Sequence, residues 1–141
     1  MSNLVVDSSV VAKWILPEPD SGKAHQIVAD AGSRGEQLIV LDLAFSEVAN
    51  AIWKRHYRGL ATLEEARSFL SALLRMPVSP EPAIPLLGSA LEIAAKSHRP
   101  IYDTLFVALT ENLSLPGITA DEPLYTAVKT RHTQIMLLRN F

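Results

Sequence analysis

Acidic side chains stand at positions in this sequence where a carboxylate could do chemistry. Asp7 directly follows the apolar run 4–6, and Asp121 follows the short run 117–119 after one alanine. Because the carboxyl ends of parallel strands meet at one edge of an open α/β sheet, acids placed there can share a site. Aspartate is also a preferred N-cap at the turn from a strand to a helix, so capping explains each one equally well when taken alone. We interpret Asp42, which ends the run 38–41, as such a cap.

Two further acids lie within predicted helices. The neighbours of Glu47 at i±3 and i±4 are mostly apolar or small, which predicts that its carboxylate is not freely solvated. Asp103 opens a helix of apolar residues, where an acid also suits the positive helix end. No lysine or arginine recurs beside these positions, so we expect a divalent cation to balance them. Carboxylate ligands without cysteine or paired histidines favour Mg²⁺, with Mn²⁺ as the alternative, over Zn²⁺.

Composition excludes several classes of protein. The chain has 141 residues, enough for one domain (1–141) with a sizeable core, and it has no cysteine, which removes disulfide frameworks and thiolate metal sites. The glycines form no phosphate-binding loop or dinucleotide fingerprint, and the histidines show no ligand spacing. No apolar stretch approaches the ~18–20 residues that span a bilayer, and residues 1–4 do not open a leader peptide. We therefore expect a soluble, cytoplasmic protein without a membrane partner.

The pattern of apolar residues predicts strands that alternate with helices. Apolar runs predict strands at 4–7, 38–41, 77–80, 117–119 and 134–138, of which 77–80 contains prolines and suits a sheet edge. Helical spacing connects them, and the helix beginning near Asp20 is predicted to end at Gly32 and Gly35. Gly59 and the capping-box pair Thr62 and Glu65 predict a helical hairpin near residues 43–74. The expected product is a three-layer α/β/α domain with a mainly parallel sheet of about five strands.

Within these elements, four segments resemble the motifs of PIN-domain proteins, particularly VapC-type toxins of bacterial toxin–antitoxin pairs. The segments are LVVDSSVVAKW (4–14), FSEVANAIW (45–53), IYDTL (101–105) and ITAD (118–121), in the family's order. The match extends over essentially the whole chain. It implies a PIN-like fold.

The resemblance also implies an activity and a set of site residues. The activity is Mg²⁺-dependent hydrolysis of RNA phosphodiester bonds, and the acidic quartet is Asp7, Glu47, Asp103 and Asp121. Ser9 and Thr119 are the polar neighbours that orient carboxylates or water. We assign Asp7 and Asp103 as metal ligands, Asp121 as a ligand of the same or a second ion, and Glu47 as a ligand or a residue that orients water.

Basic and aromatic residues follow Glu47 on the same predicted helix. Lys54, Arg55 and Arg58 could grip RNA phosphates, and Lys54 lies close to two turns from Glu47 on one face. Cations near a helix C-terminus also simply favour the dipole, so both readings stay open. We predict that Trp14 and Trp53 are core or interface residues rather than platforms for stacked bases.

The resemblance implies two partners besides RNA, a small antitoxin that blocks the cleft and a second copy of the chain. Two other functions are weighed: a PIN-fold module that binds without cutting, and a phospho-acceptor receiver domain, which fits badly because Glu47 lies inside a helix. Four carboxylates gathered without metal repel one another. From the sequence alone we therefore expect Asp103→Asn to leave the metal-free fold as stable as before, or more so.

Overall fold

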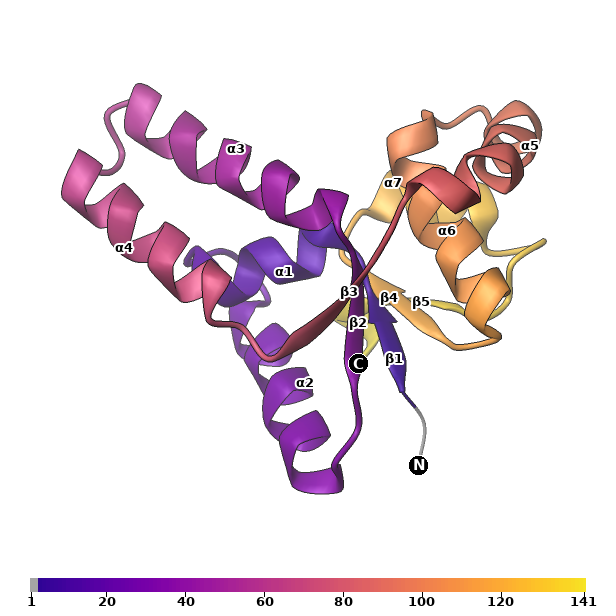
Figure 1. The fold of residues 1–141 in the computed structure, drawn as a ribbon, viewed down its shortest axis with the longest axis horizontal. Helices are drawn as coiled ribbons and strands as arrows, with labels where there is room; N and C mark the ends of the chain where they lie inside the picture. The colour runs from indigo at the N-terminus through magenta and orange to yellow at the C-terminus, as the bar shows by residue number, and fades with distance from the viewer. Residues whose placement is uncertain (1–2) are drawn as a thin grey trace.

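In the computed structural model, which describes residues 3–141, a five-stranded sheet lies between two layers of helices (Figure 1). Its strands are β1 (Leu4–Val6), β2 (Leu38–Leu41), β3 (Val78–Glu81), β4 (Gly117–Thr119) and β5 (Ile135–Leu137). They run in the order β3-β2-β1-β4-β5, and every neighbouring pair is parallel. The predicted fold class and all five strands are confirmed. Residues 1 and 2, part of the segment predicted not to open a leader peptide, lie outside the described residues.

Helices cover both faces of the sheet because successive strand residues point to opposite sides. Val6 belongs to the apolar core shared with α1 (Ser8–Ile15), α2 (Ser21–Arg34), α3 (Leu43–Tyr57) and α4 (Leu63–Leu74). Val5 belongs to the core shared with α5 (Leu87–Ser97), α6 (Ile101–Leu113) and α7 (Glu122–Val128). Short 3₁₀ turns, η1 (Ile84–Leu86) and η2 (Leu138–Asn140), complete the chain. The two cores hold the carboxyl ends of β1 and β4 rigidly side by side.

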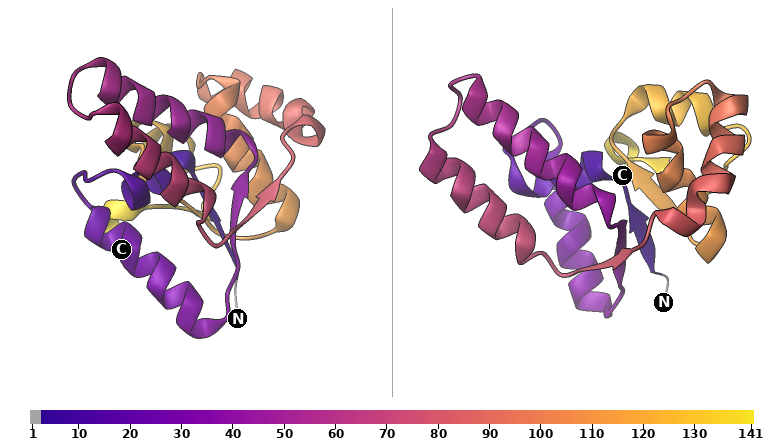
Figure 2. Two further views of the ribbon diagram at one scale, coloured as in Figure 1. Left: turned by 60° about the vertical axis from the view of Figure 1, so that its left-hand side comes forward. Right: turned by 45° about the horizontal axis from the view of Figure 1, so that its top comes forward.

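The helical hairpin of α3 and α4 projects beyond the edge of the sheet (Figures 1 and 2). Gly59 turns the chain with φ 74°, a left-handed conformation that glycine adopts without strain. Thr62 Oγ1 then accepts from Glu65 N at 3.1 Å, and Glu65 Oε1 accepts from Thr62 N at 2.9 Å. This capping box confirms the predicted start of α4.

Helix α6 is seated closely on β4. A Cβ atom added at Gly117 would lie 2.4 Å from Thr110 Cγ2 and 2.9 Å from Phe106 Cζ, so only glycine permits this approach. Thr104 through Thr110 are all buried. The close packing fixes the first turn of α6, which carries Asp103, relative to the sheet.

Several local predictions are wrong. Gly32 lies inside α2, which continues to Arg34 and ends at Gly35 with φ 66°. Asp42 makes no capping hydrogen bond, because its Oδ1 accepts from Ala83 N at 3.3 Å instead. Trp53 is 52% exposed and stacks on Tyr57 with ring centroids 5.1 Å apart, so of the two predicted positions, core or interface, the core is wrong and the interface stays a prediction.

Trp14, by contrast, is a core residue as predicted: it is buried and its indole Nε1 donates to Ala24 O at 2.8 Å. Among residues 3–141, no helix combines the length and the apolar character needed to cross a bilayer.

Candidate active site

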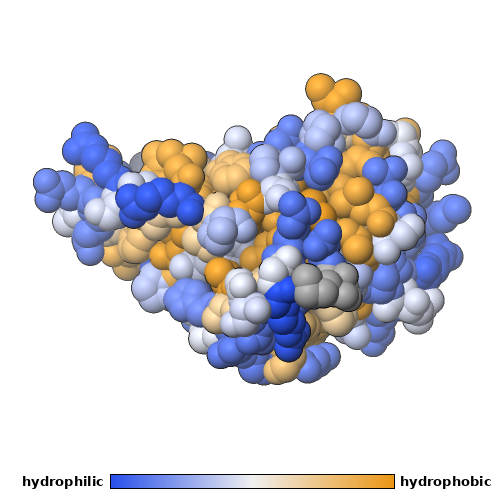
Figure 3. Space-filling model, turned by 60° about the horizontal axis from the view of Figure 1, so that its bottom comes forward, coloured by the Kyte–Doolittle hydropathy of each residue, from blue (hydrophilic) through white to orange (hydrophobic). Residues whose placement is uncertain are grey.

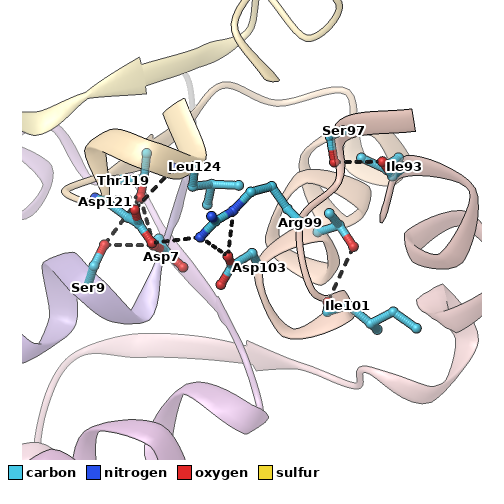
Figure 4. A network of polar contacts seen from close by, with 11 residues as sticks. Asp7, Ser9, Ile93, Ser97, Arg99, Ile101, Asp103, Thr119, Asp121 and Leu124 are labelled. Atoms are coloured by element: carbon cyan, nitrogen blue, oxygen red, sulfur yellow. Dashed lines mark hydrogen bonds and ion pairs between the residues drawn. The ribbon is translucent and has the colours of Figure 1, made fainter. Parts of the chain in front are cut away.

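Asp7 occupies the junction between β1 and α1. It stands at the N-cap position, but its side chain makes no capping hydrogen bond. Instead its Oδ2 accepts from Ser9 Oγ at 2.6 Å and from Thr119 Oγ1 at 2.7 Å (Figure 4). Thr119 is 112 residues away in sequence and reaches Asp7 because β1 and β4 are parallel neighbours. The capping explanation for Asp7 is therefore wrong.

Ser9 and Thr119 hold the chain around this acid. Ser9 Oγ accepts from Ala120 N at 2.9 Å, and Thr119 Oγ1 accepts from Asp121 N at 3.1 Å. The two hydroxyl oxygens lie 3.2 Å apart, but each gives its single proton to Asp7. The position of the Asp7 carboxylate is thereby fixed by two donors that are themselves anchored to the backbone.

Asp121 has two functions that use different oxygens. Its Oδ1 accepts from Leu124 N at 3.1 Å and so caps α7, as the sequence predicts. Its Oδ2 lies 4.0 Å from Arg99 Nη2, on the side of the other acids (Figure 4). Helix capping and membership of the acidic site are therefore compatible at this residue.

Asp103 is paired with a basic residue that the sequence analysis missed. Arg99 Nε and Nη2 both donate to Asp103 Oδ2, at 3.1 and 2.7 Å. The expectation that no basic side chain balances the acids is thus wrong for Asp103. The signal was present in the sequence: Arg99 precedes Asp103 by four residues, the spacing of a helical ion pair, although Pro100 separates it from α6.

Glu47 lies on α3 beside a shallow recess that also reaches Asp7, Ser8 and Tyr102. The residue as a whole is exposed, and Val48 is its buried neighbour on α3. The Glu47 carboxyl group is partly desolvated, as the sequence predicts. Partial desolvation of the carboxyl group and the charge of Asp7 raise the pKa of Glu47 to about 7. Asp103 adds to this rise, and a hydrogen bond from Ser8 opposes it.

Electrostatic coupling joins the acids into one cluster. Burial is the main cause that raises the pKa of Asp7, and the charges of Asp103 and Asp121 raise it further. The hydrogen bonds from Ser9 and Thr119 oppose the rise. Asp7, Asp103, Asp121 and Glu47, from four separate segments, therefore meet at the carboxyl edge of the sheet.

The donor set of this cluster consists of carboxylate oxygens, which suits a hard divalent cation such as Mg²⁺ or Mn²⁺. Within residues 3–141, no three acidic or histidine side chains already stand in the arrangement that encloses one ion. Ser9 and Thr119 occupy Asp7 Oδ2, and Arg99 occupies Asp103 Oδ2. The carboxylate ligands therefore fit a divalent metal chemically. In this structure, oxygens of two of them are hydrogen-bonded to protein side chains.

The three basic residues predicted to grip RNA differ in their surroundings. Lys54 and Arg58 are exposed near the end of α3. Arg55 Nη2 donates to Pro17 O at 3.0 Å and lies 3.6 Å from Glu18 Oε2, so it ties α3 to the loop between α1 and α2. Of the three, Lys54 and Arg58 remain available to a ligand.

The structure thus defines an α/β protein with an acidic centre at the carboxyl edge of a parallel sheet. The PIN-domain family model matches residues 4–129, and the chain belongs to the PIN-domain family. This confirms the predicted resemblance and sets aside the receiver-domain alternative.

Relatives within that family are named as nucleases. The chain is 35% identical over 123 residues to ribonuclease VapC3 of Pyrobaculum aerophilum, covering 86% of this chain and 91% of that protein. Its fold is similar to that of PAE2754 from the same organism, with a TM-score of 0.74, 21% identity and coverage of 99% and 85%. It is also similar to a VapBC-5 structure from Mycobacterium tuberculosis, described as a toxin–antitoxin system, with a TM-score of 0.57, 16% identity and coverage of 97% and 98%.

Proposed function

We propose that this protein is a divalent-metal-dependent ribonuclease that hydrolyses RNA phosphodiester bonds and serves as the toxin of a toxin–antitoxin pair. The observation that carries the proposal is the convergence of Asp7, Glu47, Asp103 and Asp121 on one edge of the sheet. The name of the relative VapC3 supports RNA as the substrate class. Hydrolysis of a phosphodiester needs an activated water and neutralisation of phosphate charge, which a carboxylate-bound cation provides.

Each acid has a role that its surroundings favour. Asp7, Asp103 and Asp121 would hold Mg²⁺ or Mn²⁺, which when bound lowers the pKa of water and stabilises charge on the phosphate. Ser9 and Thr119 keep the Asp7 carboxylate oriented at the carboxyl end of β1. Glu47 lines the same recess as Asp7, a position from which it would bind the ion or orient the attacking water.

Substrate binding is assigned to the basic residues at the end of α3. Lys54 and Arg58 are exposed there and can contact phosphates of an RNA strand that lies along the hairpin. Arg55, also predicted to bind RNA, would have to exchange its contacts to Pro17 and Glu18 for a phosphate. Phosphate contacts of this kind add affinity and little sequence preference.

The test is cleavage of labelled RNA with Mg²⁺ or with chelator. Asp7→Asn should remove metal-dependent cleavage, because it replaces a ligand charge at the centre of the cluster. Asp42→Asn is the matched control: Asp42 also follows a strand, and asparagine retains the oxygen that accepts from Ala83 N. We expect Asp42→Asn to cleave like the parent. RNA binding by the parent without metal-dependent turnover would instead support the non-catalytic binding module.

The proposed partners need surfaces of their own. Exposed apolar side chains occur on the α3–α4 hairpin and, separately, on the lobe of η1, α5 and α6. Apolar surface is visible in both the left and the right half of the face drawn in Figure 3. The hairpin carries Trp53, Tyr57, Leu60, Leu63, Leu70 and Leu74; the lobe carries Ile84, Leu87, Leu91 and Tyr102. Two such areas support two protein contacts, which we assign to a small antitoxin and to a second copy of the chain.

A further inference from the structure

Arg99 is the basic residue closest to the acidic cluster, and neither the metal-binding role nor the nuclease role described above uses it. We propose that Arg99 is an internal counter-ion that holds Asp103 and Asp121 in the metal-free protein and that a divalent cation must displace. Arg99 would thereby set the affinity of the site for metal. The inference rests on the proposed metal-dependent function and adds a residue that regulates it.

The contacts of Arg99 place its charge between two of the proposed ligands. Two of its nitrogens donate to the same oxygen of Asp103, and Nη2 also lies 4.0 Å from Asp121 Oδ2. In Figure 4 the guanidinium lies between Asp103 on one side and Asp7 and Asp121 on the other. The side chains of Arg99, Asp103 and Asp121 are 29%, 25% and 30% exposed, so the pairing is partly shielded from water.

The backbone holds Arg99 in this place. His98 ends α5 in a left-handed conformation with φ 58°, and its N–H donates to Ala94 O. Pro100 begins α6, and its carbonyl accepts from Asp103 N and Thr104 N at 3.0 and 3.2 Å. The backbone of Arg99 therefore lies in a short link between two hydrogen-bonded helix ends.

The stability of α6 does not explain a cation here. The N-terminus of a helix is its positive end, where Asp103 is favourable and an arginine is not. The C-terminus of α5, which ends just before Arg99, favours a cation, and the carboxylates in front of Arg99 favour one as well. A divalent cation bound to Asp103 and Asp121 would be repelled by the guanidinium charge beside it, so Arg99 opposes metal binding until its side chain moves away.

Metal affinity of the RNA-free protein tests this directly. We expect Arg99→Gln to bind Mn²⁺ and Mg²⁺ about fivefold more tightly in calorimetric titrations, the change that corresponds to loss of an ion pair of ~1 kcal/mol. Arg99→Lys, which keeps the charge but not the two-point contact, should fall between Arg99→Gln and the parent. Arg75→Gln is the matched control for net charge, since the exposed Arg75 side chain donates to Ser71 at the end of α4. Equal or weaker metal binding by Arg99→Gln would overturn the proposal.

The Arg99 side chain in the parent provides a second readout, which does not depend on any variant folding. Its Nε–H signal in a nitrogen–proton NMR spectrum is identified by its absence in Arg99→Lys. Addition of Mg²⁺ should move this signal to the position of solvent-exposed arginines, because its bond to Asp103 is lost. A signal that stays in place while the parent binds Mg²⁺ overturns this inference alone. A parent that binds no divalent metal overturns both the inference and the proposed function.

Discussion

Asp7, Asp121 and Asp103 are each held by a different kind of partner. Two hydroxyls fix Asp7, a backbone N–H fixes one oxygen of Asp121, and the guanidinium of Arg99 fixes Asp103. Only the last of these partners carries a charge. Single substitutions at these positions should consequently change the free energy of unfolding by different amounts.

Asp103→Asn should destabilise the metal-free protein by about 0.5–1 kcal/mol, the contribution typical of a partly exposed ion pair. Repulsion among the acids alone would predict no loss, but Arg99 reverses that expectation because its best partner is removed. Mg²⁺ should raise the melting temperature of the parent and leave that of Asp103→Asn nearly unchanged. Thermal melts in chelator and in Mg²⁺ measure both effects. A variant that responds to Mg²⁺ like the parent would show that Asp103 is not a ligand.

Glu47 gives the metal-free protein a pH-dependent stability. Its pKa is raised from 4.5 to about 7, so between these values the folded state keeps a proton that the unfolded state has released. Stability from this residue is therefore greatest at low pH and falls as pH rises through the window from about 4.5 to about 7. Urea unfolding in chelator at a series of pH values should show a steeper fall for the parent than for Glu47→Gln. Parallel profiles for the two proteins would contradict the raised pKa.

At the scale of elements, the site depends on the turns that end β1 and β4 and on the helix starts beside them. The sequence predicted these elements because their signals are local: apolar runs for strands and an aspartate at the start of α7. The prediction of Asp42 as a cap was wrong and Arg99 was missed because their contacts are not local in the sequence pattern. Whether a side chain turns to its own helix, to Ala83 or to an acid across the helix boundary depends on tertiary contacts that no local pattern contains.

The capping box of α4 gives an element-scale test. Thr62→Ala removes the hydroxyl that accepts from Glu65 N and should cost about 1 kcal/mol of stability. Thr62→Ser retains the hydroxyl and should behave like the parent in the same urea titration. Metal binding should be unaffected in both, because the α3–α4 turn lies at the far end of the projecting hairpin (Figure 1). Equal stability of Thr62→Ala and the parent would show that the capping box does not contribute to the free energy of unfolding.

On the scale of the whole molecule, the acidic edge lies between two lobes with exposed apolar side chains. The two lobes pack on separate apolar cores. Within the described residues, the apolar side chains on the outside of each lobe stay exposed to solvent. Apolar area of this kind is commonly buried in self-association. We expect light scattering at micromolar concentration to give the mass of a dimer. A monomer mass throughout that range would contradict the proposed homodimer and leave the active-site assignment standing.

The central claim is that acids from four segments form one divalent-metal site. Crystals grown without metal and then soaked in Mn²⁺ test it most directly, through the anomalous scattering of the ion. We expect a peak in contact with carboxylate oxygens of Asp7 and Asp103, at the roughly 2.0–2.3 Å of such bonds, with the Arg99 guanidinium moved away from Asp103. A fully soaked crystal with no peak at this edge, or with Arg99 still bound to Asp103 beside an ion elsewhere, would contradict it.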